Sequence, residues 1–303
     1  MSTKKQHFVP QVYLEGFAQN YKGNGKPVIW RYSLPEIKRP KDAVPIDSVC
    51  ISKNQYEVTD KNGKIVHENY IEKALGGFES MFSRYRKRIE NRVNVSQIGC
   101  GGFLSRDERA FWAVYTLVQV FRMPSMISTI EEVTAEYYRE SVTSNQVHNI
   151  ARMYALPFFC NDILEDDEGA IFRLHFDQIR GKAISVGISS GKAFYSSDHP
   201  AIVFTDEKKE GIGEIIFPLT YCLLLRIHSD DEAEGGRLFR VDDKLVEKIN
   251  HLTVEHAEKE LYVNHQLVRS EEKFVKEALL HRTIIQEGER LRREKEQNNC
   301  KDR

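Results

Sequence analysis

The sequence predicts an α+β fold in which a helical N-terminal layer packs on a mostly antiparallel sheet from the C-terminal half, followed by a long C-terminal helix. Apolar residues recur at helical spacing between about residues 70 and 156. Short β-rich runs separated by Gly, Asp and Lys follow between residues 182 and 228. From Ser270 onward, a charged helical pattern extends to a frayed tail.

Composition indicates a folded globular protein. The chain has 303 residues, 41% of them hydrophobic, and its 44 basic and 45 acidic residues leave a net charge of -1. This balance gives no sign of the basic excess typical of strong nucleic-acid binders, although a local basic groove remains compatible with it. The start MSTKKQ has no apolar signal-peptide stretch, no apolar run reaches membrane-spanning length, and the five cysteines are dispersed. We therefore expect a cytoplasmic protein with reduced thiols and no membrane association.

The first helix is expected just after a polar tail of six residues. Pro10 suits its first turn, because a first-turn residue does not need the N–H that proline lacks. Val9, Tyr13 and Phe17 follow one another at intervals of four and give this helix an apolar face. The run VIWRYS (28–33) should form a short strand.

A hairpin and the long helices come next. Asn62-Gly63 supplies the turn residues of the hairpin, and a helix should span about 70–93. Ser105 resembles a helix start, and the following FWAVYTLVQVF is apolar nearly all round, so this helix should lie in the core. Pro124 should end or kink it, with further helices to about residue 141 and over 145–156 before an acidic loop, LEDDEGA.

The C-terminal half should supply three or four strands, a helix over 241–261 and a last strand in YVNHQL. We expect a single domain over residues 5–265 and a charged helix and tail over 266–303. That final helix has two interpretations. It could pack on its own domain through Phe274 to Ile285 and end in solvent, or it could bind a partner protein or a second copy of the chain.

Two carboxylates and an arginine are candidates for chemistry. Glu72 and Glu79 are seven residues apart, about two helical turns, so they share a face and could serve a metal, a reacting proton or only a charged helix edge. Arg122 follows the apolar stretch in QVFRMP and needs a partner, because an unpaired buried charge is costly. The partner could be Glu72 or Glu79, or a ligand phosphate or carboxylate. Gln119 shares the face of Arg122.

Polar residues in the C-terminal half are also candidates. Asp198 lies in the turn SSDHP, where it could cap local N–H groups or act as a metal ligand or base. Asn250 stands among apolar positions of a helix and could bond a loop backbone or a ligand. His251 and His256 can bind metals, but a spacing of five fits one helical face poorly, and we discount them.

Seven stretches together carry a resemblance: HFVPQVYLEGFA (7–18), NQY (54–56), IE…E (71–79), QVFRMP (119–124), SDHP (197–200), FPLT (217–220) and the Asn250…Ala257…Tyr262 series. In this order they resemble the bacterial family called domain of unknown function 4238, over about residues 5–265. The resemblance implies no established activity. It implies that the following residues occupy motif positions: His7, Gln11, Glu72, Glu79, Gln119, Arg122, Asp198 and Asn250. Tyr221 stands where a second proline is expected after FPLT, which puts that turn's geometry in doubt.

A polar set drawn from separated segments is typical of a buried site, so we expect the N-terminal segment to carry His7 into one. The candidate catalytic residues are His7, Gln11, Glu72, Glu79, Arg122, Asp198 and Asn250. The candidate metal ligands among them are His7, Glu72, Glu79 and Asp198. Carboxylate oxygens with one imidazole suit Mg²⁺ or Mn²⁺.

Two functions follow as hypotheses. The first is a metal-dependent hydrolase, a nuclease or phosphodiesterase acting on nucleic acid, in which the metal activates water and Arg122 neutralises phosphoryl charge. The family's sequences look like those of bacterial and phage-associated accessory proteins, which implies a toxin or phage-defence context. The alternative is a non-catalytic binding or sensor module, in which Arg122 pairs with Glu72 or Glu79 in a structural network.

Overall fold

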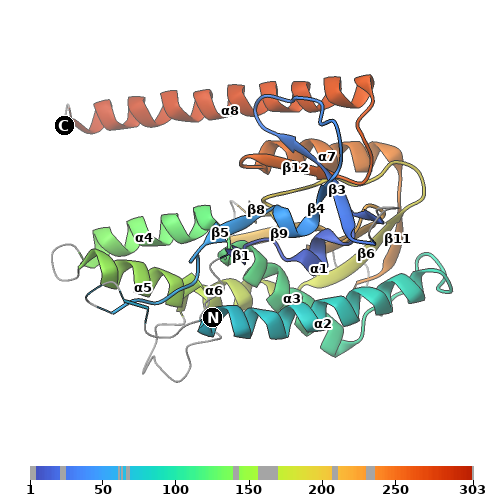
Figure 1. Cartoon of the computed structure of the whole chain (residues 1–303), viewed down its shortest axis with the longest axis horizontal. Helices are drawn as coiled ribbons and strands as arrows, with labels where there is room; N and C mark the ends of the chain where they lie inside the picture. The colour runs from blue at the N-terminus through green and yellow to red at the C-terminus, as the bar shows by residue number, and fades with distance from the viewer. Residues whose placement is uncertain are drawn as a thin grey trace.

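The structure, a computed structural model, describes residues 5–20, 25–60, 62, 64–65, 69–138, 143–155, 170–206, 211–229 and 236–301. It confirms the predicted α+β fold. One helical layer, α2 to α6, covers one side of the sheets, and α7 and α8 cover the other side (Figure 1). The helices are α1 (Gln11–Leu14), α2 (Tyr70–Val93), α3 (Arg106–Phe121), α4 (Pro124–Tyr138), α5 (Ser144–Ala155), α6 (Ala170–Ile179), α7 (Asp243–His256) and α8 (Arg269–Lys301), with a 3-10 turn η1 (Ile46–Ser48).

The first sheet comes entirely from the C-terminal half, as predicted. Its strands stand in the order β11-β6-β10-β9-β8, and only the β11–β6 pair is parallel. The strands are β6 (Ala183–Ser189), β8 (Ile202–Asp206), β9 (Gly211–Pro218), β10 (Leu223–His228) and β11 (Leu238–Val241). Leu224, Leu225 and Ile227 of β10 are all buried, because both faces of this strand are covered.

The second sheet joins the two ends of the chain. Strand β12 pairs with β3 on one side and with β7 on the other, and β3 also pairs with β2 and β4. The strands are β2 (Gln19–Asn20), β3 (Pro27–Ser33), β4 (Val44–Pro45), β7 (Ser196–Ser197) and β12 (Glu260–Val263). The sequence predicted β3 and a last strand in YVNHQL (262–267), but the observed β12 begins at Glu260, because α7 ends at His256 and not near residue 261. The pairing of β3 with β12 was not predicted. A third, two-stranded sheet pairs β1 (Lys5–His7) with β5 (Ile51–Lys53).

The local signals at helix ends act as predicted. The Ser105 hydroxyl accepts a hydrogen bond from the Glu108 N–H, and the Glu108 carboxylate accepts one from Ser105, a complete capping box. Helix α3 ends at Phe121, and Pro124 begins α4. Among the described residues, the predicted hairpin forms an antiparallel bridge between Thr59 and Ile65. Lys61, Gly63, residues 66–68 and nearly all of the acidic loop lie outside the described residues.

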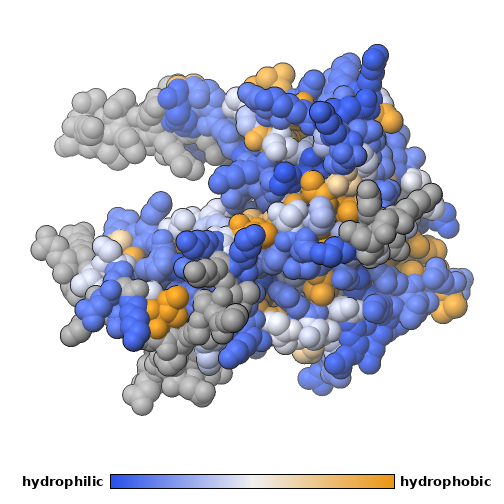
Figure 2. All heavy atoms as spheres, viewed as in Figure 1, coloured by the Kyte–Doolittle hydropathy of each residue, from blue (hydrophilic) through white to orange (hydrophobic). Residues whose placement is uncertain are grey.

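The face shown in Figure 2 is mostly hydrophilic, with scattered apolar side chains. In the part of the chain that the structure describes, no helix is long and apolar enough to cross a membrane. Helix α8 packs on the domain through Val275, Ala278 and Leu279, whereas Leu280 and Ile284 remain exposed. In Figure 1, α8 then continues to the left, past α7, toward the C-terminus.

Candidate functional site

The N-terminal segment is docked tightly against the rest of the chain. Gln6 was assigned to a polar tail, but it is fully buried. Its amide donates to Glu57 Oε1 at 2.9 Å and accepts from the Tyr56 N–H at 2.8 Å. The Phe8 N–H bonds the Cys50 carbonyl at 3.1 Å. Strand β1 ends at His7, so this docking fixes the position of the histidine.

Arg122 is the centre of the candidate site. It follows α3 directly, its side chain is 1% exposed, and all three of its nitrogen groups have partners. Nη1 donates to Glu79 Oε1 at 3.1 Å, Nη2 to the His7 carbonyl at 2.5 Å, and Nε to the Tyr56 hydroxyl at 3.4 Å. Burial favours the neutral guanidine, but Tyr56 and Glu79 outweigh it and raise the pKa of Arg122. The guanidinium therefore stays charged and links the α2 helix to the backbone of the N-terminal strand.

Glu72 lies beside this cluster with unused bonding capacity. Its Oε2 is buried and accepts no hydrogen bond from the described residues. Burial raises the pKa of Glu72, Arg122 lowers it, and the nearby Glu79 and Glu57 carboxylates raise it further. A buried acceptor without a donor is uncommon and is often completed by a ligand or water.

The His7 ring is half-buried next to Gln11. Gln11 Nε2 lies 3.5 Å from Nδ1 and 3.4 Å from Nε2 of His7, so the amide of α1 faces the ring. Burial lowers the pKa of His7, a hydrogen bond with the Asp47 backbone and the Glu79 charge raise it, and Arg122 lowers it. Because the net shift is downward, the imidazole is neutral at pH 7 and can accept as well as donate a proton.

Gln119 holds the same segment from α3. Its Nε2 donates to the Phe8 carbonyl at 3.0 Å, and the side chain is buried. Its Oε1 is buried and has no partner among the described residues. Two neighbouring residues, Arg122 and Gln119, thus bind successive carbonyl groups, those of His7 and Phe8. Both side chains position the N-terminal backbone.

Asp198 makes its contacts elsewhere. Its Oδ1 accepts from the Glu258 N–H at 2.8 Å, and its Oδ2 accepts from the N–H groups of Lys259 and Glu260 at 2.7 and 3.1 Å. Burial outweighs the effect of these donors, which lower the pKa of Asp198, and the net result is a pKa raised to about 6. Both oxygens are engaged in closing the connection between α7 and β12, the capping use considered from the sequence.

Asn250 also bonds a backbone. Its Oδ1 accepts from the Tyr195 N–H at 2.8 Å, and its Nδ2 donates to the Ala193 carbonyl at 2.9 Å. The side chain therefore binds α7 to the segment leading into β7. The structure brings together five of the seven candidate residues, His7, Gln11, Glu72, Glu79 and Arg122, while the hydrogen bonds of Asp198 and Asn250 are made to other segments.

The four candidate metal ligands do not form a ready Mg²⁺ or Mn²⁺ site in this arrangement. Asp198 is saturated by backbone donors, and Glu79 is bonded to Arg122. Among the described residues, the one group of His, Cys, Asp and Glu side chains whose ligand atoms converge contains none of these four. An ion bound at Glu72 could gain Glu79 or Asp198 as a further carboxylate ligand only after that carboxylate lost its present hydrogen bonds.

Sequence reasoning missed three residues of the site: Gln6, Tyr56 and Glu57. Tyr56 could have been found, because it ends the NQY stretch that contributes to the family resemblance. Its hydroxyl accepts from Arg122 Nε and donates to the Arg122 carbonyl at 3.0 Å. Gln6 and Glu57 carried no sequence signal, since a single polar residue in a terminal segment or beside a short strand is ordinary.

Comparison with protein families gives one match, and it agrees with the resemblance. The model of the family described as "Protein of unknown function (DUF4238)" matches residues 5–266. The chain belongs to the DUF4238 family. Comparisons with curated proteins and with solved structures gave no match. The DUF4238 match runs from β1 to β12, includes all seven candidate residues, and ends just before α8 begins at Arg269.

Proposed function

We propose that this DUF4238 protein is a binding or sensor module whose network around Arg122 is structural. The observation that carries the proposal is the direct bond between Arg122 and Glu79, with the remaining donors of Arg122 turned to His7 and Tyr56. Because the Arg122 side chain is 1% exposed, a ligand phosphate or carboxylate would have to displace Glu79 or the docked β1 to reach the guanidinium. Arg122 therefore serves to hold α2 and β1 together more readily than to bind a ligand.

The polar groups that could still bind a ligand lie next to Arg122. They are the His7 ring, the Gln11 amide and the Glu72 oxygen that lacks a donor. These groups favour a small polar ligand that can donate a hydrogen bond to Glu72. Because Arg122 holds the His7 backbone, a ligand at the His7 side chain would be coupled to the docking of the N-terminal strand. This coupling is the basis of the sensor interpretation.

The test compares Arg122→Ala with a matched surface variant, Arg106→Ala. If the network is structural, Arg122→Ala should lower the free energy of unfolding by about 3–5 kcal/mol, because it strands buried partners. Arg106 is exposed at the start of α3, and its replacement should change stability by less than about 0.5 kcal/mol. Equal melting temperatures for both variants would contradict the structural role.

A hydrolase remains the second candidate, supported by a different observation. Burial displaces the pKa of His7 downward and that of Glu72 upward, so both are brought toward the neutral forms needed for proton transfer. As a nuclease or phosphodiesterase, the protein would act in the cytoplasm in a toxin or phage-defence setting. If the reaction uses Mg²⁺ or Mn²⁺, Glu72 offers the most available carboxylate oxygen.

The hydrolase candidate is tested by incubating the protein with RNA and with DNA in the presence of Mn²⁺. Glu72→Gln and Glu79→Ala should remove cleavage, while the exposed Glu132→Gln on α4 should retain it. A folded, inactive Arg122→Ala would also favour this candidate over the sensor. Failure to cleave any substrate would leave the binding module as the function.

A further inference from the structure

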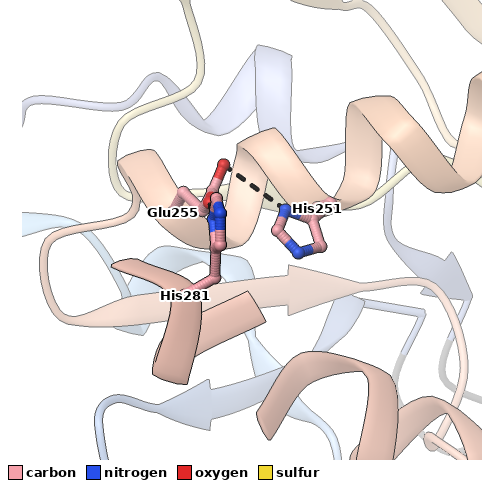
Figure 3. Close-up of side chains that lie close together, drawn as sticks. All are labelled: His251, Glu255 and His281. Atoms are coloured by element: carbon pink, nitrogen blue, oxygen red, sulfur yellow. Dashed lines mark hydrogen bonds and ion pairs between the residues drawn. The ribbon is translucent and has the colours of Figure 1, made fainter. Parts of the chain in front are cut away.

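Two helices bring three metal-binding side chains together outside the Arg122 cluster. His251 and Glu255 are one turn apart on the same face of α7, and His281 comes from α8. Figure 3 shows the three side chains pointing toward one another across the helix pair. His251 Nδ1 lies 3.3 Å from Glu255 Oε2, and His281 Nδ1 contacts Glu255 Oε1. The sequence pattern pairs His251 with His256 and gives no sign of His281, because His281 comes from a different helix.

The spacing of these groups fits a bound transition-metal ion. Their ligand atoms all lie within 4.8 Å of one another. Ligands about 2.1 Å from a tetrahedral ion stand roughly 3.4 Å apart, so small side-chain rotations would complete the coordination. Two imidazoles and one carboxylate form a donor set typical of Zn²⁺, whereas Mg²⁺ and Ca²⁺ prefer oxygen donors.

The surrounding packing fixes the backbones that carry the ligands. Val254, Val275 and Ala278 are fully buried between α7 and α8. The His251 ring lies against the Phe274 ring, with centroids 5.9 Å apart. The side chain of Glu255 is 12% exposed, but that of His281 is 57% exposed, so the cluster is open to solvent on one side. An ion could therefore enter, and a fourth coordination position would face water.

We propose that His251, Glu255 and His281 form a binding site for Zn²⁺ or a similar divalent transition-metal ion, with the fourth position open to water. The ion joins α7, inside the domain, to α8. The site shares no residue with the Arg122 cluster, and it stands whether or not the function proposed above is correct. With an open position, the site can hold the ion as a structural clamp or present it to a small ligand.

Zn²⁺ binding to the full-length chain without an affinity tag tests this assignment. After treatment with a chelator, calorimetric titration with Zn²⁺ should give one saturable site per chain. His251→Ala and His281→Ala should each weaken binding by about 100-fold or more, since even changes outside the direct ligands cost about 10- to 100-fold. His256→Ala is the matched control, because His256 is exposed at the end of α7 and takes no part in the cluster; its effect should be less than about threefold.

The far-UV circular dichroism of each variant shows whether α7 and α8 are retained. His281 is exposed, so His281→Ala should keep the helical signal and the metal-free melting temperature within about 2 °C of the original. Zn²⁺ should raise the melting temperature of the original chain and not that of His281→Ala. The absence of a saturable site, an unchanged affinity in His281→Ala, or an equal loss in His256→Ala would overturn the proposal.

Discussion

Replacing Asp198 should destabilise the protein by interrupting the connection between α7 and β12. The Asp198 carboxylate accepts three backbone hydrogen bonds, from Glu258, Lys259 and Glu260, at distances of 2.7 to 3.1 Å. The residue is 5% exposed, so water has little access to these donors. Asp198→Ala removes the acceptor of all three N–H groups, in a connection where Glu258 and Glu260 are half-buried and Lys259 is exposed.

The magnitude follows from the cost of an unsatisfied buried donor, about 1–3 kcal/mol for each. Relaxation of the loop should return part of this cost, and we expect about 3–5 kcal/mol in total. The entropy of unfolding of a chain of this length is roughly 0.6 kcal/mol/K, so the melting temperature should fall by about 5–8 °C. Asp198→Asn retains one oxygen acceptor and should cost about half as much.

Differential scanning calorimetry of the two variants measures this loss. Asp177→Ala is the control, because Asp177 is an exposed aspartate on α6 that pairs only with nearby Arg180, and its removal should shift the melting temperature by less than about 1 °C. The reasoning would be refuted if Asp198→Ala melted as high as this control. It would also be refuted if Asp198→Asn were the more damaging of the two changes.

Three further predictions concern other parts of the fold. Gly16→Ala should cost about 1–3 kcal/mol, because its Cβ would come within 2.6 Å of the Leu219 carbonyl; Gly76→Ala, with no atom within 4 Å, should be neutral or stabilising in the same denaturant titrations. Folding lowers the pKa of His7, so its contribution to stability is present above its unfolded-state pKa, near 6.5, and is lost as the pH falls through its folded-state pKa. His7→Gln should therefore reduce the drop in melting temperature between pH 7 and 5. Deletion of residues 289–303 should leave the number of chains per particle, the melting temperature and any activity unchanged. A change from dimer to monomer in light scattering would instead show that the tail is an interface.

Local signals in the sequence predicted most helices and the β6, β8, β9 and β10 strands of the first sheet, because short-range chemistry determines them. They did not predict β11. The capping box at Ser105, the apolar stretch ending at Phe121 and the break before Pro124 are examples. The same reasoning did not reveal the second sheet, since the pairing of β3 with β12 depends on contacts between the two ends of the chain. It also missed α6, whose first residues follow an acidic stretch.

For the candidate site, the sequence indicated candidate residues but not the partner that each of them contacts. It offered Glu72 or Glu79 as the partner of Arg122, and the structure selects Glu79. It could not show that Arg122 also donates to the His7 carbonyl and the Tyr56 hydroxyl. Every residue has a backbone carbonyl, so the amino-acid sequence does not indicate which carbonyl accepts a hydrogen bond. For the same reason, the capping role of Asp198 could only be one of several alternatives.

The second sheet also constrains the order in which this protein can fold during synthesis. Tyr32 accepts a hydrogen bond from the Leu267 N–H across 235 residues, beside the pairing of β3 with β12. At about 5–20 residues per second, the ribosome needs roughly 10–50 s to make the intervening chain. Throughout that interval one edge of β3 lacks its final partner, and such edges invite pairing with other chains. Truncations that stop before β12 should therefore aggregate, and a chaperone that shields nascent chains should raise the soluble yield of the full-length protein.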